Sequence, residues 1–382
     1  MHPVLRLLSI LAVLGASFAV IPTAHAAKRQ VPFGFYGVMW DGDIATAPAK
    51  QQDRQWALMA RSGVESVRTV FSWALTQPTA DGPLDFTDSD RKMAMASRHG
   101  VALLPVVLYT PHWAARSPDT FGSTPKYASD YAAFMRQLVL RYGPRGSFWG
   151  ENPKLPRRPI RDWQLWNEPH FDFYWHVPGA DKTQWASEYV ELLRQARPAI
   201  KQTDPGARIV LAGLADASWR IMAELYRAGV QGNFDVATVH IFTGRPEYVM
   251  TAVELVGREL KRHGEGRKPI WVTEATFPAG KGRVSLPPLE WQRQWYTTDR
   301  GMGKRLRELY SLGAERHRSL RLKRIYWVTW ATTYSGDDLF HYSGLVRYRG
   351  VGAKPRPSLG AYRASARRHQ GCAKTTAGTC VR

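Results

Sequence analysis

The stretch ARIVLAGLADASWRIMAELYRAGVQGNFDVATVHIF, residues 207–242, contains the alternation that decides the fold. Residues 207–215 are a short apolar run, as expected of a buried strand. Residues 218–229 have the spacing of an amphipathic helix that ends at a glycine, and residues 234–242 are again β-branched and apolar. Strand, helix and strand in direct succession indicate two parallel strands joined by a crossover helix.

The same alternation covers most of the chain. Further strands are expected at 33–40, 64–73, 101–109, 160–166, 268–277 and 323–332. Further helices are expected at 48–63, 86–100, 127–143, 182–202, 246–264, 289–316 and 357–368. Eight strand–helix units in one α/β domain favour a closed (β/α)8 TIM barrel over an open doubly wound sheet. No G-x-G-x-x-G follows the first strand, which weakens a dinucleotide-binding alternative.

The two ends of the chain differ from the barrel pattern. Residues 1–26 read as a secretory signal, with Arg6 before an apolar run and small residues at the cleavage site. An uncleaved N-terminal anchor is the alternative. The catalytic barrel would then occupy 27–370, and 371–382 would be a polar tail. This tail holds both cysteines, Cys372 and Cys380, which an exported chain can join in a disulfide; two free thiols are the alternative.

The net charge of +21 predicts association with polyanions. For a secreted, extracellular protein these are anionic glycans, a cell wall or a membrane surface. A solvated basic surface that aids solubility is the plain alternative. The basic residues are dispersed and no nucleic-acid motif accompanies them, so nucleic acid is not expected as a partner. No later stretch is long enough to span a membrane. No metal or cofactor is expected, because no His or Cys cluster has ligand spacing.

Two carboxylates end strands of the predicted barrel. The fourth strand ends in Asn167 and Glu168, and the seventh, PIWVTEATF, places Glu274 near its end. Catalytic residues of such barrels lie at the carboxyl ends of strands, so both side chains should reach the same mouth. A pair of carboxylates is what glycoside hydrolysis requires. The aromatic residues around Glu168 provide a setting that raises a carboxyl pKa. Each glutamate alone could instead be an ion-pair residue at the barrel mouth.

The motifs WNEP (166–169) and WVTE (271–274) resemble the two signatures of the clan A glycoside hydrolases. Residues 141–175 are more specifically similar to family 39-type bacterial enzymes, with family 5 a neighbour. The resemblance implies a retaining glycosidase, a hydrolase of O-glycosyl compounds, with an oligo- or polysaccharide substrate. It implies that Glu168 is the general acid/base and Glu274 the nucleophile of a double displacement.

The resemblance also suggests substrate-binding residues. Asn167 would hydrogen-bond the sugar 2-hydroxyl, and Arg68 would keep the nucleophile ionised, unless it forms only a structural ion pair. Trp330 would form the floor of the sugar site, unless it is plain core. His240, His112 and Trp40 are weaker candidates, since each is equally compatible with a packing role.

One departure from the clan pattern concerns the sixth strand. Clan members often have a tyrosine there that hydrogen-bonds the nucleophile, whereas this chain has Phe242. Either Tyr334 takes that role, or Arg68 alone tunes the nucleophile.

Three other functions remain open at this point. A transglycosidase would use the same residues and transfer the sugar to another sugar. A non-catalytic carbohydrate-binding barrel would not need both carboxylates. A basic cell-surface or nucleic-acid adhesion protein would bind polyanions in a salt-sensitive way.

Overall fold

The computed structural model describes residues 28–177, 179, 184–284, 290–350, 352–371, 374–376 and 379–381. In this part of the chain, eight parallel strands form one sheet in the order β5-β4-β3-β2-β1-β8-β7-β6. The strands are β1 (Tyr36–Met39), β2 (Ser66–Ser72), β3 (Ala102–Leu108), β4 (Asp162–Leu165), β5 (Arg208–Val210), β6 (Ala237–His240), β7 (Ile270–Ala275) and β8 (Leu322–Trp327).

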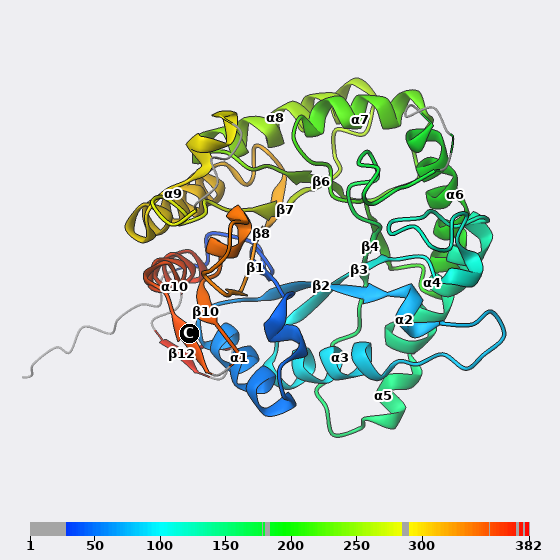
Figure 1. Ribbon diagram of the computed structural model, residues 1–382, viewed down its shortest axis with the longest axis horizontal. Helices are drawn as coiled ribbons and strands as arrows, with labels where there is room; N and C mark the ends of the chain where they lie inside the picture. Colours follow the sequence, from blue (N-terminus) through cyan, green and yellow to red (C-terminus); the bar gives the residue numbers. More distant parts are fainter. Residues whose placement is uncertain are drawn as a thin grey trace, which may run out of the picture.

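The sheet closes between β5 and β6. Val210 and Val236 form a parallel bridge. The backbone N–H of Leu211 donates to the carbonyl of Val236 at 3.0 Å, and that of Val236 donates to the carbonyl of Ile209 at 3.1 Å. The predicted (β/α)8 TIM barrel is therefore confirmed, and Figure 1 shows its helices as a ring around the strands.

The outer helices follow the strands in sequence. They are α1 (Ala49–Arg61), α3 (Thr87–His99), α4 (Ala128–Tyr142), α6 (Trp185–Thr203), α7 (Ser218–Arg227), α8 (Pro246–Arg262), α9 (Asp299–Arg316) and α10 (Pro357–Gln370). Proline and glycine mark the ends of several of these helices. Proline occupies the first turn of α8 and α10, where its missing N–H costs no helical bond. Gly100 ends α3 in the left-handed conformation, at φ 73°.

Shorter elements lie outside this alternation, and the sequence pattern did not predict them. Two are the short helices α2 (Trp73–Thr76) and α5 (Ser147–Glu151). A small sheet, β9 (Ala331–Thr332), β10 (Val346–Tyr348) and β11 (Ala353–Pro355), follows the eighth strand. The expected helix 289–316 is divided into a 3₁₀ turn, Glu290–Trp295, and α9. The other expected helices and strands are present, but several strands are much shorter than expected; the run 207–215, for example, retains only β5, Arg208–Val210.

The predicted tail contains a β-hairpin, β12 (Lys374–Thr376) and β13 (Thr379–Val381). Cys372 lies outside the described residues, and only the backbone of Cys380 is described, so their pairing stays a prediction. The expected signal segment, 1–26, also lies outside the described residues. None of the described helices combines the length and the apolar character that a membrane crossing needs.

The core has two layers. Apolar side chains between the strands and the outer helices form one large buried cluster, and β3 is buried on both faces, as parallel strands require. Inside the barrel, a second cluster consists of Leu104, Val210, Val236, Trp271 and Tyr326. The interior is thus filled with side chains below the mouth, and the carboxyl ends of the strands carry the polar groups described next.

Candidate active site

Glu168 projects from a strained turn directly after β4. Trp166 and Glu168 have φ angles of 73° and 41°, in the left-handed region that non-glycine residues seldom adopt. The turn is fixed on both sides. The N–H of Glu168 donates to the carbonyl of Gly213 at 3.1 Å, and the N–H of Phe171 donates to the carbonyl of Glu168 at 3.0 Å. Such strain persists where the surroundings impose it, and it is concentrated at functional sites.

Arg68 of β2 connects three strand ends through one guanidinium group. Its Nη1 lies 2.6 Å from Oε1 of Glu274 on β7. Its Nη2 donates to Oδ1 of Asn167 at 2.7 Å, and its Nε donates to Oε1 of Gln164 on β4 at 2.7 Å. Arg68 is only 1% exposed, so its charge is balanced by these partners and not by water. The residues that the sequence placed on strands two, four and seven are therefore in direct contact.

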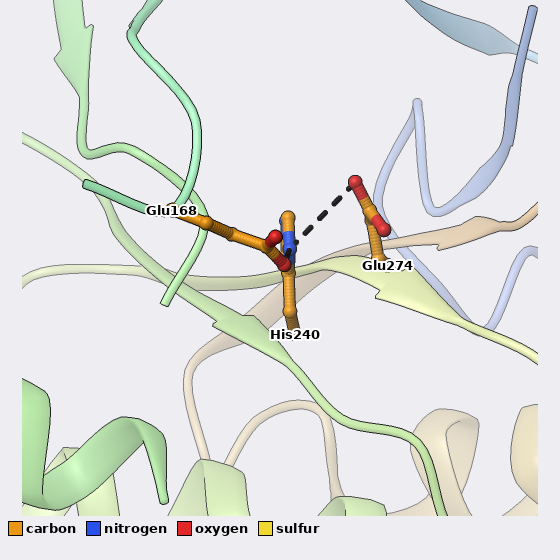
Figure 2. Close-up of side chains that lie close together, drawn as sticks. All are labelled: Glu168, His240 and Glu274. Carbon is orange, nitrogen blue, oxygen red and sulfur yellow. Dashed lines mark hydrogen bonds and ion pairs between the residues drawn. The ribbon is translucent and has the colours of Figure 1, made fainter. Parts of the chain in front are cut away.

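His240, the last residue of β6, lies between the two carboxylates, as Figure 2 shows. Its Nδ1 is 2.7 Å from Oε1 of Glu168 and 3.6 Å from Oε1 of Glu274. The imidazole is completely buried, and burial lowers the pKa of His240 to about 3. It is therefore a neutral ring at physiological pH, and only its contact with Glu168 has hydrogen-bond length.

Gly213 provides the space for this histidine. A Cβ atom at position 213 would lie 1.9 Å from Cε1 of His240, far inside van der Waals contact. Gly213 follows β5, and its carbonyl also receives the N–H of Glu168. One residue without a side chain thus positions both partners of the His240–Glu168 contact.

The two carboxylates have different surroundings. Burial is the main cause that raises the pKa of Glu168 to about 7; the charge of Asp216 raises it further, and Arg68 opposes the rise. Glu274 instead forms the direct ion pair with Arg68. One oxygen of each carboxylate lies within 4.8 Å of the other and of a ring nitrogen of His240. The mouth of the barrel therefore holds a carboxyl group that keeps a substantial protonated fraction at neutral pH beside a charge-paired carboxylate.

Glu168, His240 and Glu274 also form the kind of ligand set that can hold a divalent metal. Two features of the site oppose this use. The guanidinium of Arg68 already contacts Oε1 of Glu274 at 2.6 Å, so a second cation would meet a like charge. Nδ1 of His240 contacts Glu168. Its Nε2 has no hydrogen-bond partner among the described residues and lies next to Gly213.

The tryptophans expected in the cleft are buried. Trp330 is 0% exposed and its Nε1 donates to Oε1 of Gln55 at 3.1 Å, so it offers no free face for a sugar ring. Trp40 is 1% exposed and packs against Trp56, with ring centroids 5.6 Å apart. Both are buried residues that contact α1, in agreement with the alternative of a packing role.

Two other candidates, His112 and Tyr334, do not contact the carboxylate cluster, and Phe242 does not take the place of the clan tyrosine. His112 is an exposed residue of the loop after β3, 3.8 Å from Asp119, and does not contact the buried cluster. The hydroxyl of Tyr334 donates to the carbonyl of Gly344 at 2.6 Å and does not contact Glu274. Phe242 packs on Phe340, with ring centroids 4.8 Å apart. Of the two options for tuning the nucleophile, the structure retains the one that relies on Arg68.

The sequence reading missed several residues that complete the site. Gln164, Gly213 and Asp216 were not given a role. Tyr174 was also missed; burial, followed by the charges of Glu168 and Glu274, raises its pKa. The positions of Gly213 and Asp216 directly after the fifth strand were the available signal, because that strand neighbours the fourth.

A hollow of about 380 Å³ lies at the same end of the barrel, between the segments after β1 and β8. Its lining includes Asp41, Thr329, Asp338 and His341. Asp41 is hydrogen-bonded by the hydroxyl of Thr329, and burial raises its pKa. Neither Glu168 nor Glu274 lines this hollow, and its lining combines apolar surface with these polar groups.

Comparison with known proteins supports the fold. No protein-family model matches this chain, and no curated protein matches it. A family 39 glycoside hydrolase from Bacteroides cellulosilyticus WH2 has 17% identity and a TM-score of 0.64, over 89% of this chain and 64% of that enzyme. A β-xylosidase from Caulobacter crescentus CB15 has 19% identity and a TM-score of 0.62, over 88% and 69% of the two chains. A family 1 β-glucosidase from Thermotoga maritima has 11% identity and a TM-score of 0.59, over 90% and 99%.

These likenesses agree with the clan A resemblance of the WNEP and WVTE motifs. This chain spans about 64% of the length of the Bacteroides enzyme. At such low identities the shared property is the architecture. The chain has the (β/α)8 barrel fold of family 39 and other clan A glycoside hydrolases.

Proposed function

We propose that this protein is a retaining glycoside hydrolase in which Glu168 is the general acid/base and Glu274 is the nucleophile. One observation carries the proposal: two carboxylates at the ends of β4 and β7 lie within 4.8 Å of each other in opposite electrostatic settings. Retaining glycosidases need carboxyl groups roughly 5–5.5 Å apart, whereas inverting enzymes need about 6.5–9.5 Å to admit a water molecule.

In the first step, a carboxylate oxygen of Glu274 attacks the anomeric carbon while the bond to the leaving oxygen breaks. Glu168 gives its proton to that oxygen, so the leaving group departs as a neutral alcohol. The raised pKa of Glu168, about 7, keeps this proton available near neutrality. In the second step, Glu168 takes a proton from water, which attacks the anomeric carbon and releases Glu274. Two inversions give net retention of configuration.

His240 positions the acid/base in this scheme. A neutral imidazole that donates from Nδ1 to Oε1 of Glu168 leaves Oε2 to hold the catalytic proton. The same hydrogen bond favours the ionised form of Glu168 in the second step. Because His240 stays neutral, it supplies this contact without adding a charge that would lower the pKa of Glu168.

Arg68 and Asn167 support the nucleophile and the sugar. The permanent charge of Arg68 favours the ionised form of Glu274 as leaving group in the second step. Because Oδ1 of Asn167 accepts from Arg68, the side-chain amide group of Asn167 is oriented, and its nitrogen can donate to a sugar hydroxyl near the anomeric carbon.

The substrate in this proposal is a glycan outside the cell. Residues 1–26 act as a secretory signal, and the charge of +21 holds the protein near anionic glycans or a cell wall. Asp41, Asp216 and the two glutamates make the mouth itself acidic, so the polyanion association belongs to the outer surface. If the affinity for an anionic glycan decreases with salt while the turnover rate stays constant, polyanion binding occurs at the outer surface and not at the mouth.

The direct test is a screen of β-linked nitrophenyl glycosides, beginning with xyloside, glucoside and mannoside. Those sugars are chosen because the structural neighbours are named as β-xylosidases, β-glucosidases and an exo-β-1,4-mannosidase. Turnover by the unmutated protein that is lost in both Glu168→Gln and Glu274→Gln supports the proposal. No turnover of any β-glycoside or β-glycan by folded protein contradicts it.

A further inference from the structure

Two loops at the mouth of the barrel are joined to each other beside Glu168. The loop after β3 and the loop after β4 meet at Gly122 and His176, where the N–H of His176 donates to the carbonyl of Gly122 at 2.9 Å. The N–H of Thr124 donates back to the carbonyl of His176 at 3.2 Å. Gly122 permits this approach, because a Cβ there would lie 2.1 Å from the carbonyl oxygen of Phe173.

The joined loops present two aromatic rings to solvent. Phe121 is 56% exposed and Phe173 is 61% exposed, and their ring centroids are 4.8 Å apart. Tyr109, directly after β3, supports Phe121 at 5.6 Å, and Tyr174 supports Phe173 at 5.0 Å. Exposed, adjacent apolar rings on fixed backbone are unfavourable in water and typical of binding surfaces.

One ring of this pair, that of Phe173, lies on the same backbone turn as the acid/base residue. Phe173 and Tyr174 lie on the turn that begins at Glu168, since the N–H of Phe171 donates to the carbonyl of Glu168 and that of Tyr174 donates to the carbonyl of Phe171 at 2.9 Å. The indole of Trp166 donates to the carbonyl of Tyr174 at 2.7 Å and fixes the turn from below. Tyr174 is close enough to both carboxylates for their charges to act on its hydroxyl.

We infer that Phe121 and Phe173 form a leaving-group subsite, which holds a ring-bearing leaving group by contact with its flat face. This inference rests on the proposed function, because only that function defines a leaving group. The nucleophile attacks the anomeric carbon from the side opposite the departing oxygen, and that oxygen must face its proton donor, Glu168. The leaving group therefore lies on the β3–β4 side of the mouth, where the aromatic pair is. Its occupant is a second sugar of the glycan, or an aryl group in a synthetic substrate.

The test compares two substrates of the same sugar, a nitrophenyl glycoside and a glycosyl fluoride. The fluoride carries no ring in its leaving group, and it needs little protonic help to depart. The variants are Phe121→Ala, Phe173→Ala and the double variant, with Phe33→Ala as the matched control, since Phe33 is also 56% exposed but lies before β1 at the opposite end of the barrel. The measured quantity is kcat/KM, which includes every step up to departure of the leaving group.

The double variant should lose about tenfold or more in kcat/KM toward the nitrophenyl glycoside, the scale of a lost aromatic contact, and stay within about twofold of wild type toward the fluoride. Phe33→Ala should change neither value. Equal losses on both substrates, or no loss on either, would overturn the inference while the proposed function stands. No turnover of either substrate by the unmutated protein would overturn the proposed function and this inference with it.

Discussion

Among the described residues, the barrel has an ionic cluster at each end, and the two clusters have opposite charge balances. At the amino ends of the strands, Asp162 lies 2.8 Å from Arg324 and 2.6 Å from Arg208. Arg324 also donates to the hydroxyl of Tyr326 at 3.2 Å and lies over the ring of Trp271 at 4.0 Å. One carboxylate is thus shared by two guanidinium groups.

At the carboxyl ends the balance is reversed. Glu168 and Glu274 share a single buried guanidinium, that of Arg68, and a neutral histidine. The backbone that carries Glu168 is strained, and Nε2 of His240 has no hydrogen-bond partner among the described residues. Each cluster thus carries one charge in excess, positive at the amino ends and negative at the carboxyl ends. At the carboxyl ends, burial raises the pKa of Glu168 to about 7 against the opposing charge of Arg68, so Glu168 can hold a proton for chemistry near neutrality.

Glu274→Gln should give the largest effect on activity. The amide cannot act as a nucleophile, so we expect kcat on a nitrophenyl glycoside to fall by about 10⁴-fold or more. The free energy of unfolding should also fall, because Arg68, which is 1% exposed, loses the carboxylate that pairs with it. Steady-state kinetics and urea unfolding measure the two quantities. Substantial residual kcat would remove Glu274 from the mechanism.

Asp162→Asn should lower the free energy of unfolding and have little effect on kcat. It leaves Arg324, which is 9% exposed, without its counter-charge, and breaking such a buried pair costs about 3–5 kcal/mol. Where the variant is folded, its kcat should stay close to wild type, because the cluster is at the far end of the barrel. Arg208→Gln is the milder control, since the Arg208 side chain is 44% exposed. A stable but inactive Asp162→Asn would contradict the division between the two ends.

Gly213→Ala should damage catalysis through His240. The new Cβ would meet the imidazole at 1.9 Å, so the ring must move away from Glu168. A displacement near 1 Å at a catalytic contact costs about 10²-fold, and we expect kcat/KM to fall on this scale. Gly360→Ala in α10 is the control, because nothing lies within 4 Å of its added Cβ. Full activity of Gly213→Ala would show that the His240–Glu168 contact is dispensable.

The smallest expected effect is the pH dependence set by Glu168. Burial raises its pKa to about 7, so kcat/KM should decrease about tenfold per pH unit above that value as the acid loses its proton. For stability, a raised pKa favours the folded state fully below the ordinary value of 4.5, and this contribution is lost as the pH rises through about 7. Glu168→Gln should therefore be more stable than wild type at pH 8 but not at pH 4. Identical stability differences at the two pH values would contradict the assigned pKa.

The sequence predicted the architecture well because the barrel depends on a repeated local pattern. Apolar runs at 101–109 and 268–277 form strands that are buried on both faces, one against the outer helices and the other inside the barrel, so periodicity suffices. The small β9–β11 sheet depends on contacts between short segments with no such repeat, and its pattern gives little signal. Glu168 and Glu274 reach one mouth because they lie at the carboxyl ends of β4 and β7. Period-2 alternation alone does not place them, because Trp166 and Glu168 have positive φ angles and the β7–β8 register shifts between Val272 and Ala275.

Side-chain depth was harder to predict. Trp330 and Trp40 end strands as cleft residues would, yet the segments packed over them bury both rings completely. The role of Gly213 depends on how closely the backbone after β5 approaches His240, a distance set by the closed barrel and not by either local segment. Phe121 and Phe173 are 52 positions apart, and only the pairing of their loops brings the rings together.

The most direct test of the central claim is azide rescue of two alanine variants on an activated aryl glycoside, with the product configuration assigned by NMR. Glu168→Ala should form the glycosyl-enzyme and stall, and azide should attack it to give a glycosyl azide of retained configuration. Glu274→Ala cannot form that intermediate, so azide should enter the vacated space and give the inverted product. Exchanged stereochemical outcomes would show that the two roles are reversed, and an inverted first product from the wild-type enzyme would contradict the retaining mechanism itself.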